Sequence, residues 1–277
     1  MPELPEAETI RRQLLRSVRG AVITETRVLH RRMTRNQPRR PSLRALTEGR
    51  RITDVGRHGK MVTLTLDPPA TLLIRLGMSG QVLVCRDDAP PGDHTRVRFR
   101  LRGGEELRLD DMRMFGGVQA FPSADPAAIP PLAALGPDAL GLDFTREHLA
   151  ATLRKRTAPL IALLMNQSLV AGLGNIYANE ACFAAGVHPL RRGGDLRRPD
   201  HAALHNAVRR VLAEAVRLRG TSMRDGLYRD LDGAPGDYQR RLRVYAREGE
   251  PCLRCRTPIT RARHQGRSVF FCAKCQR

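Results

Sequence analysis

The sequence predicts an α+β protein of two domains with a small cysteine-bearing module at its end. Between Ala21 and Phe121 apolar and polar residues alternate in short runs, which is typical of strands with one buried face. After Phe144 the spacing of the apolar residues becomes helical. The proline-rich residues 122–143 separate the two regions and mark a predicted hinge. We therefore expect an N-terminal antiparallel sandwich or barrel, followed by a helical domain.

The charge of the chain favours a polyanionic partner. Lys and Arg number 48 against 28 Asp and Glu among 277 residues, a formal net charge of +20. Most basic residues are Arg, whose planar fork suits phosphate, so nucleic acid is the first candidate and a membrane surface the second. A compositional bias unrelated to binding is the alternative. The chain has no long apolar run that would span a membrane and no recognisable secretory signal.

The first helix is predicted over residues 5–19. Ile10 and Leu14 lie on one face of it, and Gly20 is a residue type that ends helices. Pro5 suits the first helical position, and acidic residues suit the first turn. Considered alone, these residues favour an ordinary helix start.

The residues before this helix also carry possible chemistry. Met1 precedes a small residue, so its removal is expected, and Pro2 then becomes the amino terminus. An α-amino group has a pKa of about 8, so a fraction is neutral and nucleophilic near pH 7. A secondary amine that attacks a sugar carbon forms an iminium ion, which is an electron sink. Glu3 and Glu6 are close enough in sequence to transfer protons.

The alternating runs in the N-terminal half predict several short antiparallel strands. Gly and Pro clusters separate the runs, as expected for turns. The alternating residues are Val62, Leu64 and Leu66; Leu72, Ile74 and Leu76; Val97, Phe99 and Leu101; Leu107 and Leu109. An antiparallel sandwich or barrel follows from strands of this length and spacing.

A lysine-bearing turn is predicted at residues 56–60, which read Gly-Arg-His-Gly-Lys. Glycine on both sides lets the backbone approach a ligand closely. Lys60, at the start of the next strand, could hold a phosphate or protonate a leaving oxygen. The alternative is a strand-edge lysine that prevents aggregation.

Two further turns carry side chains that could enter a base stack. Residues 75–80 form a predicted turn with Met78 exposed at its tip, unless that side chain returns to the core. In residues 110–116, Arg113 and Phe115 alternate out of a strand end and are expected to share one face. An apolar ring can be inserted into a stack while the guanidinium pairs with the orphaned base. A buried Phe beside a solvated Arg is the alternative.

The helical half contains a possible phosphate site. Basic residues 154–156 follow the first of its helices, and residues 160–164 form another. A further helix starts at Asn175 after two glycines, where backbone amides at a positive helix end suit a phosphate. Ordinary N-capping by Asn175 is the alternative and can coexist. A long helix, capped by Asp200, extends to Gly220.

The tail carries the strongest chemical pattern. Cys252-x2-Cys255 and Cys272-x2-Cys275 are two knuckles that can each supply two thiolates to one zinc ion. Such a site is structural, because all four positions are occupied. Two disulfides are the alternative, and a reducing cytoplasm disfavours them. Arg267 lies between the knuckles, where it could contact phosphate.

The other two cysteines, Cys85 and Cys182, stand alone in apolar surroundings. We predict that both are buried thiols without a catalytic role. This use of cysteine suits a reducing compartment, so a cytoplasmic protein is expected.

Taken together, these segments resemble the bacterial formamidopyrimidine-DNA glycosylases, which excise oxidised purines from DNA and nick the strand. Order and spacing extend the resemblance over essentially the whole chain. It is carried by residues 2–9, 56–60, 111–116 and 167–180 and by the four-cysteine tail. The resemblance implies a β-sandwich, a helix–two-turn–helix motif at residues 167–180 and a β-hairpin zinc finger.

The resemblance implies catalytic roles for Pro2, Glu3, Lys60 and Arg267. Pro2 would be the nucleophile that attacks C1′ of the damaged nucleotide. Glu3 would handle protons, with Glu6 as a supporting acid, and Lys60 would assist elimination. Arg267 would position the phosphate at the lesion and act in a second elimination.

The resemblance also implies how DNA is held. Met78, Arg113 and Phe115 would fill the space left by an extruded base. The residues expected to contact DNA are His94, Arg113, Arg156 and Asn175. The expected partner is double-stranded DNA containing oxidised bases or abasic sites. We expect a monomer, associated with the nucleoid in a bacterial cytoplasm.

Two positions depart from the family pattern. Arg75 stands where His is usual, and Ile161 stands where a Lys linked to lesion contacts is often found. Leu4 favours the purine-excising branch over the related endonuclease VIII type, which usually has Gly there and prefers oxidised pyrimidines. A non-catalytic damage-binding protein would be expected to lack the catalytic residues. A zinc-finger transcription factor would need a base-reading helix, which the sequence does not indicate.

The predicted organisation has four segments. They are a catalytic β-sandwich domain, a linker or hinge, a helix–two-turn–helix domain and a four-cysteine zinc finger. Their predicted bounds are residues 1–125, 126–143, 144–251 and 252–277.

Overall fold

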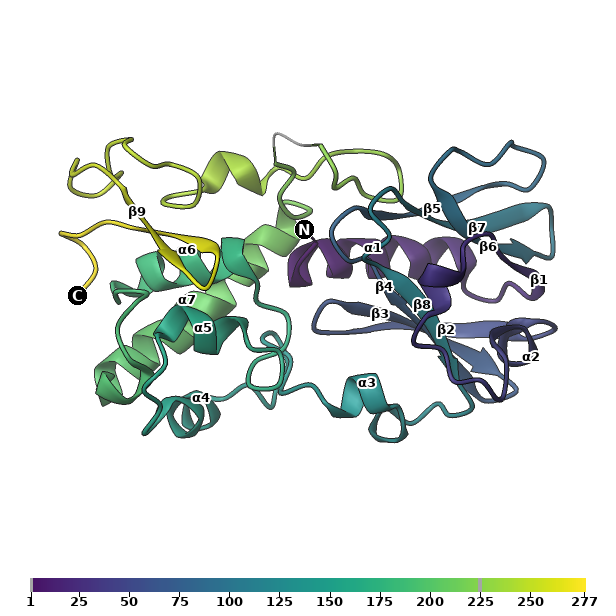
Figure 1. The fold of residues 1–277 in the computed structure, drawn as a ribbon, viewed down its shortest axis with the longest axis horizontal. Helices are drawn as coiled ribbons and strands as arrows, with labels where there is room; N and C mark the ends of the chain where they lie inside the picture. The colour runs from purple at the N-terminus through teal and green to yellow at the C-terminus, as the bar shows by residue number, and fades with distance from the viewer. Residues whose placement is uncertain (1, 224–225) are drawn as a thin grey trace. The chain divides into compact units, whose positions relative to one another are not determined.

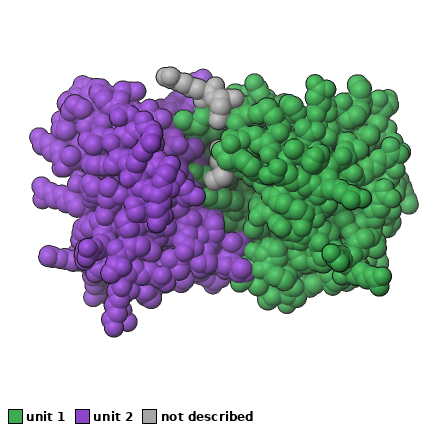
Figure 2. All heavy atoms as spheres, viewed as in Figure 1, with its two compact units in different colours: residues 1–133, 219–237 green, residues 134–218, 238–277 purple. Residues whose placement is uncertain are grey.

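The computed structural model describes residues 2–223 and 226–277 (Figure 1). Met1, whose removal is expected, lies outside the described residues. The chain forms two compact units, which Figure 2 shows in green and purple. Their bounds are Met1–Ala133 with Arg219–Asp237, and Ala134–Leu218 with Tyr238–Arg277.

The first unit is an antiparallel β-sandwich, which confirms the predicted fold and decides between sandwich and barrel. One sheet has the order β1-β6-β7-β5, with strands Ile23–Val28, Thr95–Leu101, Glu105–Asp111 and Gly80–Arg86. The other has the order β2-β3-β4-β8, with strands Arg51–His58, Met61–Asp67, Ala70–Arg75 and Gly117–Phe121.

The core of this unit follows from the predicted alternation. Apolar residues at alternate positions of β3, β4, β6 and β7 are buried in one hydrophobic cluster. Strand β2 lacks the alternation, because the register shifts between Ile52 and Asp54. Ile52 and Val55, three positions apart, are therefore both buried, at 0% and 1% exposure.

Helix α1, Leu4–Val18, begins and ends one residue earlier than predicted. It contacts β2 and β3, and its apolar face joins the cluster through Ala7, Ile10 and Leu14. Two short helices lie between β1 and β2 in the chain. They are the 3-10 helix η1, Arg31–Thr34, and helix α2, Leu43–Thr47.

Segment Arg219–Asp237 belongs to the first unit, although it follows a helix of the second. Tyr228 lies in the hydrophobic cluster, and Gln13 of α1 accepts a 3.0 Å hydrogen bond from the Leu231 amide. The Gln13 side chain also donates to the Asp232 carboxylate at 2.9 Å. These residues fall within the predicted helical domain, residues 144–251, because helical periodicity ends at Gly220 and the sequence does not indicate where the chain goes next.

The second unit is helical, as predicted, with a terminal β-hairpin. Its main helices are α4, Arg146–Leu153; α5, Leu160–Met165; α6, Asn175–Ala185; and α7, Arg198–Arg217. The hairpin consists of β9, Thr260–His264, and β10, Arg267–Phe271. The 3-10 helix η3, Gly193–Asp195, lies between α6 and α7, and the 3-10 helix η4, Tyr238–Arg241, lies between α7 and β9.

One local prediction needs correction. The N-cap residue of α7 is Arg197 and not Asp200. Asp200 lies in the first turn, and its carboxylate accepts a 2.9 Å hydrogen bond from the Arg197 amide, as the third helical residue of a capping box does. The predicted linker contains two short helices, η2, Pro126–Ala128, and α3, Pro130–Ala133. The Asp125 side chain accepts a bond from the Ala127 amide at 2.9 Å, which starts the first of these turns.

Within the described part of the chain, no helix is both long and apolar enough to cross a bilayer.

Candidate active site and zinc site

The start of the chain is buried in the first unit. Pro2 is buried, and Glu3 and Glu6 are only 2% and 1% exposed. The Glu6 carboxylate accepts hydrogen bonds from the amides of Glu3 and Thr221, each at 2.7 Å. The first bond orders the start of α1, as in a capping box. The second ties it to segment Arg219–Asp237, so the start of α1, which directly follows Pro2 and Glu3, is fixed in the first unit.

The turn that carries Lys60 is linked to α1. Lys60 is half-buried and lies just before β3, between the paired residues His58 and Met61. The Arg57 guanidinium donates to the Glu8 carboxylate at 3.0 Å and to the Gly59 carbonyl at 2.9 Å. Arg57 therefore holds the turn against the helix that begins at the chain start.

Glu8 is the acidic end of this link. Burial raises the pKa of its carboxyl, but hydrogen bonds from Arg11, Arg12 and Arg57 lower it more, so the pKa lies below its ordinary value. Glu8 is consequently ionised wherever the protein is near neutral pH.

Met78, Arg113 and Phe115 lie on two adjoining turns. A Cβ on Gly77 would lie 2.4 Å from the Gly116 nitrogen, so the two turns pack backbone against backbone. The Arg113 Cζ lies 4.9 Å from the centre of the Phe115 ring, a cation–π contact. Phe115 is 40% exposed, so the alternative of a buried Phe is wrong.

Two details of these turns differ from expectation. Met78 is half-buried instead of fully exposed. Strand β7 ends at Asp111, so Arg113 and Phe115 project from the following turn and not from the strand end. The two side chains nevertheless meet, and the intervening Met114 has a φ of +53°.

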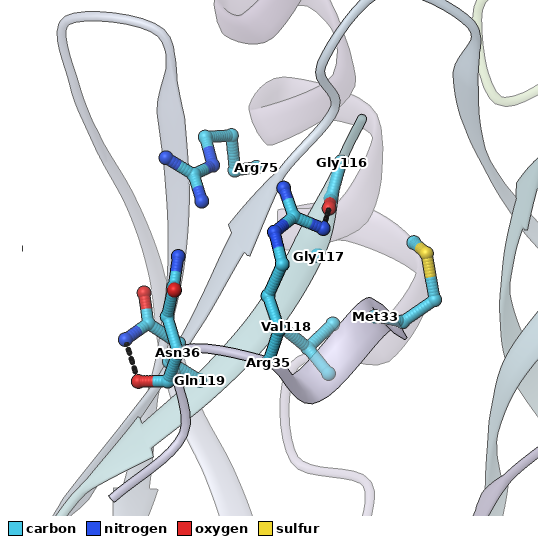
Figure 3. Close-up of a pocket in the computed structure, with 8 residues that line it drawn as sticks. All are labelled: Met33, Arg35, Asn36, Arg75, Gly116, Gly117, Val118 and Gln119. Carbon is cyan, nitrogen blue, oxygen red and sulfur yellow. Dashed lines mark hydrogen bonds between the residues drawn. The ribbon is translucent and has the colours of Figure 1, made fainter. Parts of the chain in front are cut away.

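Arg75, the first departure from the family pattern, lines a small pocket with Arg35 and Asn36 (Figure 3). Arg75 is half-buried. Burial, and then the charge of Arg35, lower the pKa of its guanidinium. The pocket therefore gathers two cationic side chains at the end of β4.

His94 is exposed immediately before β6. Its carbonyl accepts a 2.9 Å hydrogen bond from the amide of Asp111. Its ring Nδ1 lies 3.3 Å from the guanidinium of Arg96. The structure thus places His94 next to the turn that carries Arg113.

In the second unit, Asn175 joins α6 to the terminal hairpin. The N-cap of α6 is Gly174, so the alternative of N-capping by Asn175 is wrong. The Asn175 side chain instead donates to the Ser268 carbonyl at 3.0 Å. The neighbouring Asn179 Oδ1 accepts from the Phe270 amide at 2.7 Å. These two bonds fix β10 on α6.

The hairpin turn presents Arg267. His264 and Arg267 are paired, and the two residues between them, Gln265 and Gly266, have φ values of +47° and +75°. Positive φ at both central positions is typical of a type I′ hairpin. Arg267 is exposed, and its Nη1 lies 3.4 Å from the sulfur of Met165.

The other two positions of interest in this unit differ in exposure. Arg156 is exposed after α4 and donates to the Thr152 carbonyl at 2.6 Å. Ile161, the second departure from the family pattern, is fully buried in α5. The side chain at position 161 is therefore apolar and has no contact with solvent, so it cannot form a polar contact with a ligand.

The four tail cysteines form a metal site. Their Sγ atoms all lie within 4.8 Å of one another, with Cys252 to Cys275 at 3.9 Å and Cys255 to Cys272 at 3.4 Å. These separations are too long for disulfides, whose sulfurs lie about 2 Å apart. They fit a tetrahedral ion with Zn–S bonds of about 2.3 Å, which places sulfurs about 3.8 Å apart. The site holds one structural zinc, as predicted.

The two solitary cysteines are inert by environment. Cys182 is fully buried, which raises the pKa of its thiol to about 12. Cys85 is half-buried rather than buried, and desolvation also raises its pKa. Neither thiol is activated as a nucleophile.

Glu180, the last residue of the helix–two-turn–helix motif, has a structural role that its sequence pattern does not indicate. This residue is 1% exposed and accepts amide hydrogen bonds from Arg243, Val244 and Tyr245 at 2.9 to 3.1 Å. Burial raises the pKa of Glu180, and these amides offset part of the rise. Val244 packs in the same cluster as Cys252, so Glu180 anchors the chain that leads to the zinc site.

The predicted site residues thus fall into two sets. Those of the first unit are Pro2, Glu3, Glu6, Lys60, Met78, His94, Arg113 and Phe115, and those of the second are Arg156, Asn175, Arg267 and the four cysteines.

Comparison with known families covers most of the chain. Residues 1–118 match the model of the formamidopyrimidine-DNA glycosylase N-terminal domain, and residues 135–226 match that of the formamidopyrimidine-DNA glycosylase H2TH domain. Residues 249–277 match the zinc finger found in FPG and IleRS. A formamidopyrimidine-DNA glycosylase of Chloroflexus aggregans is 46% identical over 100% of this chain and 98% of its own length.

Solved structures agree with these matches. The Thermus thermophilus MutM (FPG) protein has a TM-score of 0.88 at 40% identity and covers 99% of this chain and 98% of its own. The Lactococcus lactis Fpg complex with DNA containing an abasic site has a TM-score of 0.89 at 31% identity, with 99% coverage of both chains. A Lactococcus lactis variant bound to DNA containing Fapy-dG has a TM-score of 0.90 at 31% identity. The chain therefore belongs to the formamidopyrimidine-DNA glycosylase family.

Proposed function

We propose that this protein is a bifunctional DNA glycosylase and abasic-site lyase that excises oxidised purines from duplex DNA. The family, and relatives named as formamidopyrimidine-DNA glycosylases across their full length, support the glycosylase activity. The solved complexes of Lactococcus lactis Fpg with Fapy-dG and abasic-site DNA support the class of substrate. The formal charge of +20 suits a DNA partner.

One observation carries the mechanistic part of the proposal. Pro2 is buried directly before Glu3, with Glu6 in the first turn of the following helix, and both acidic residues are almost fully buried. With Met1 removed, the Pro2 nitrogen is a secondary amine. An α-amino group ordinarily has a pKa of about 8, so a fraction of such groups is neutral and nucleophilic near pH 7. The hydrogen bonds of Glu6 to the amides of Glu3 and Thr221 fix this end of the chain, which supports a defined position for the amine.

The proposed reaction begins at the sugar. The Pro2 nitrogen bonds to C1′ as the bond from C1′ to the base breaks, and the departing base takes a proton. The sugar ring then opens with proton transfer by Glu3, which leaves an iminium ion, the Schiff base, between Pro2 and C1′. The iminium acidifies the C2′ hydrogen. Its loss expels the 3′ phosphate by β-elimination, and a second elimination expels the 5′ phosphate. Water hydrolyses the iminium and frees Pro2.

The remaining site residues support this sequence. Lys60, held through Arg57, is proposed to assist elimination, and Arg267 is proposed to bind the lesion-site phosphate and act in the second elimination. His94, Arg113, Arg156 and Asn175 are proposed to contact DNA, mostly at phosphates and without reading sequence.

The zinc ion has no chemical step in this proposal. Four thiolates complete its coordination, so it fixes the hairpin that carries Arg267. The protein is proposed to act as a monomer on the nucleoid of a bacterial cytoplasm.

Borohydride trapping tests the proposal. Duplexes containing 8-oxoguanine opposite C are expected to yield a covalent complex with the protein and, without borohydride, a nicked strand with phosphates at both ends. Pro2→Gly with a blocked terminus removes the amine and is expected to abolish the complex. A complex that persists in that variant counts against the proposal.

The lesion panel separates the purine branch from the pyrimidine branch. Leu4 favours oxidised purines. The fully buried Ile161, by contrast, stands where the family often has a Lys linked to lesion contacts, so this chain lacks that polar side chain. Faster release of 8-oxoguanine and formamidopyrimidine than of an oxidised pyrimidine, each tested opposite C and A, supports the purine assignment. The reverse order assigns the protein to the pyrimidine-excising branch.

A further inference from the structure

Two neighbouring turns of the first unit carry the three side chains proposed to enter the base stack. Residues 76–80 carry Met78, and residues 112–116 carry Arg113 and Phe115. The close approach of Gly77 to Gly116 leaves no space between the two backbones. The conformation of each turn therefore depends on that of the other.

A single buried carboxylate links the two turns. Asp111 is fully buried, and its Oδ1 accepts a 2.6 Å hydrogen bond from the Ser79 hydroxyl. Its Oδ2 accepts from the Gly116 amide at 2.8 Å, and the Arg113 amide lies 3.2 Å from Oδ1 and 3.1 Å from the Ser79 oxygen. Charge-assisted bonds of this kind are among the stronger ones in proteins. Asp111 thus gathers the N–H groups of one turn and the hydroxyl of the other.

A guanidinium holds the carbonyl side of the second turn. The terminal nitrogens of Arg35 lie 3.4, 3.2 and 3.1 Å from the carbonyl oxygens of Met114, Phe115 and Gly116. The same group reaches the Arg32 carbonyl at 2.9 Å. Figure 3 shows Arg35 directed at Gly116. A guanidinium presents five donors in a rigid plane, whereas an ammonium group has three donors on a single nitrogen and cannot reproduce contacts made from both Nη1 and Nη2.

The turn needs this support. Met114 has a φ of +53°, a left-handed conformation that costs a non-glycine residue free energy. Such a conformation persists only where the surroundings enforce it. Arg113 and Phe115, the residues on either side of Met114, are in contact with each other.

We propose that Arg35, Ser79 and Asp111 are positioning residues that hold Met78, Arg113 and Phe115 as one rigid wedge before DNA binds. The inference rests on the proposed function, in which these three side chains replace an extruded base. Rigid presentation means that little conformational entropy is lost when the wedge is inserted. Arg35 acts through the backbone of the turn, so its geometry matters as well as its charge.

The test measures wedge insertion separately from chemistry. A duplex with 8-oxoguanine and a 2-aminopurine beside the opposing base reports unstacking as a rise in fluorescence in stopped flow. Ser79→Ala and Arg35→Lys are each expected to slow this rise about tenfold or more, and to lower kcat for excision by a similar factor with little change in KM. The double variant is expected to lose less than the product of the two single losses, because both act on one unit.

The matched control is Arg39→Gln, which removes a charge from an exposed residue of the same segment. This variant shows how much the loss of one positive charge alone weakens the attraction to DNA. It is expected to leave the rate of wedge insertion within about twofold of that of the wild type. If the Arg35→Lys variant inserts its wedge as fast as the wild type, Arg35 contributes only its charge and the proposal fails. Independent, multiplicative losses for Ser79→Ala and Arg35→Lys also overturn it.

The fluorescence change precedes bond breaking, so the two proposals fail separately. A wild-type protein that inserts its wedge at full rate but releases no base contradicts the proposed function. Variants that insert normally in an otherwise active protein contradict the positioning role. Ser79→Ala removes one hydroxyl and keeps Asp111, so it tests the link even if an Asp111→Asn variant does not fold.

Discussion

The carboxylate of Glu6 accepts a 2.7 Å hydrogen bond from the backbone amide of Thr221, 215 positions later in the chain. Gly220, just before it, has a φ of +80°, and a Cβ there would lie 2.5 Å from the Glu6 Oε1. Glu6 is buried and also bonded to the Glu3 amide, so it cannot move aside. The position of the start of α1 and the position of segment Arg219–Asp237 therefore depend on each other.

Gly220→Ala is expected to disrupt this contact. The left-handed backbone strains any residue other than glycine, and the added methyl group also overlaps the fixed Glu6 carboxylate. We expect a loss of at least about 2 kcal/mol in the free energy of unfolding. Hydrogen exchange at the Thr221 amide should accelerate.

Gly233→Ala is the matched control, because Gly233 has a φ of +76° but open space around its Cβ position. It should cost about 1 kcal/mol from backbone strain alone. Equal losses for the two variants would show that the contact with Glu6 contributes nothing.

Glu8→Gln is expected to weaken the link between α1 and the Lys60 turn in a pH-dependent way. Because the folded-state pKa of Glu8 lies below its unfolded value, the ionised carboxylate stabilises the fold above about pH 4.3. That contribution is lost as the pH falls through the folded-state pKa. We expect the variant to be about 2 kcal/mol less stable at pH 7 and the difference to shrink toward pH 3 in denaturant titrations.

The control for this measurement is Glu25→Gln. Glu25 pairs with Arg27 and Arg100 at side chains that are 31% to 49% exposed, where ion pairs contribute little. Its effect should stay within about 0.5 kcal/mol at pH 7. A difference between wild type and Glu8→Gln that is constant from pH 7 to pH 3 would contradict the assigned cause.

Removing the zinc ion is expected to unfold the hairpin before it affects the sandwich. Cys272→Ala deletes one of four ligands, and the remaining three thiols hold zinc poorly. Zinc content should fall, amide protection in β9 and β10 should be lost, and DNA affinity should drop while the sandwich keeps its protection. Cys85→Ala, which deletes a solitary half-buried thiol, should retain a full equivalent of zinc. Loss of protection throughout both units on zinc removal would argue against a local structural role.

Arg267→Ala is expected to change the products as well as the affinity. If Arg267 binds the lesion-site phosphate and acts in the second elimination, strands that stop after β-elimination should accumulate. The slope of log affinity against log salt should fall by about one unit. Arg263→Ala removes another exposed arginine of the same hairpin and should leave the ratio of products unchanged. An identical product ratio in both variants would remove Arg267 from the second elimination.

Local sequence patterns predicted the elements whose side-chain spacing is regular. Val62, Leu64 and Leu66 alternate because β3 has one face in the core, and the knuckle spacing of the tail cysteines is itself the geometry of the zinc site. Strand β2 was not singled out, because the register shift after Ile52 breaks its alternation.

Contacts between distant parts of the chain leave no recognisable pattern in the sequence, so they could not be predicted from it. Arg35 lies in a run rich in arginine, where nothing in the spacing indicates that it bonds the carbonyls of a turn 80 residues later. The motif at residues 110–116 indicates a role for Arg113 and Phe115, but it does not show that the buried carboxylate of Asp111 holds the turn. The return of segment Arg219–Asp237 to the first unit likewise depends on tertiary contacts such as that of Gln13 with Leu231.

Mass spectrometry of the borohydride-reduced complex with 8-oxoguanine DNA tests the central claim most directly. Peptide mapping should locate the deoxyribose adduct on the nitrogen of Pro2, in a chain from which Met1 has been removed. An adduct on a lysine side chain, or active protein that still carries Met1, would contradict the account.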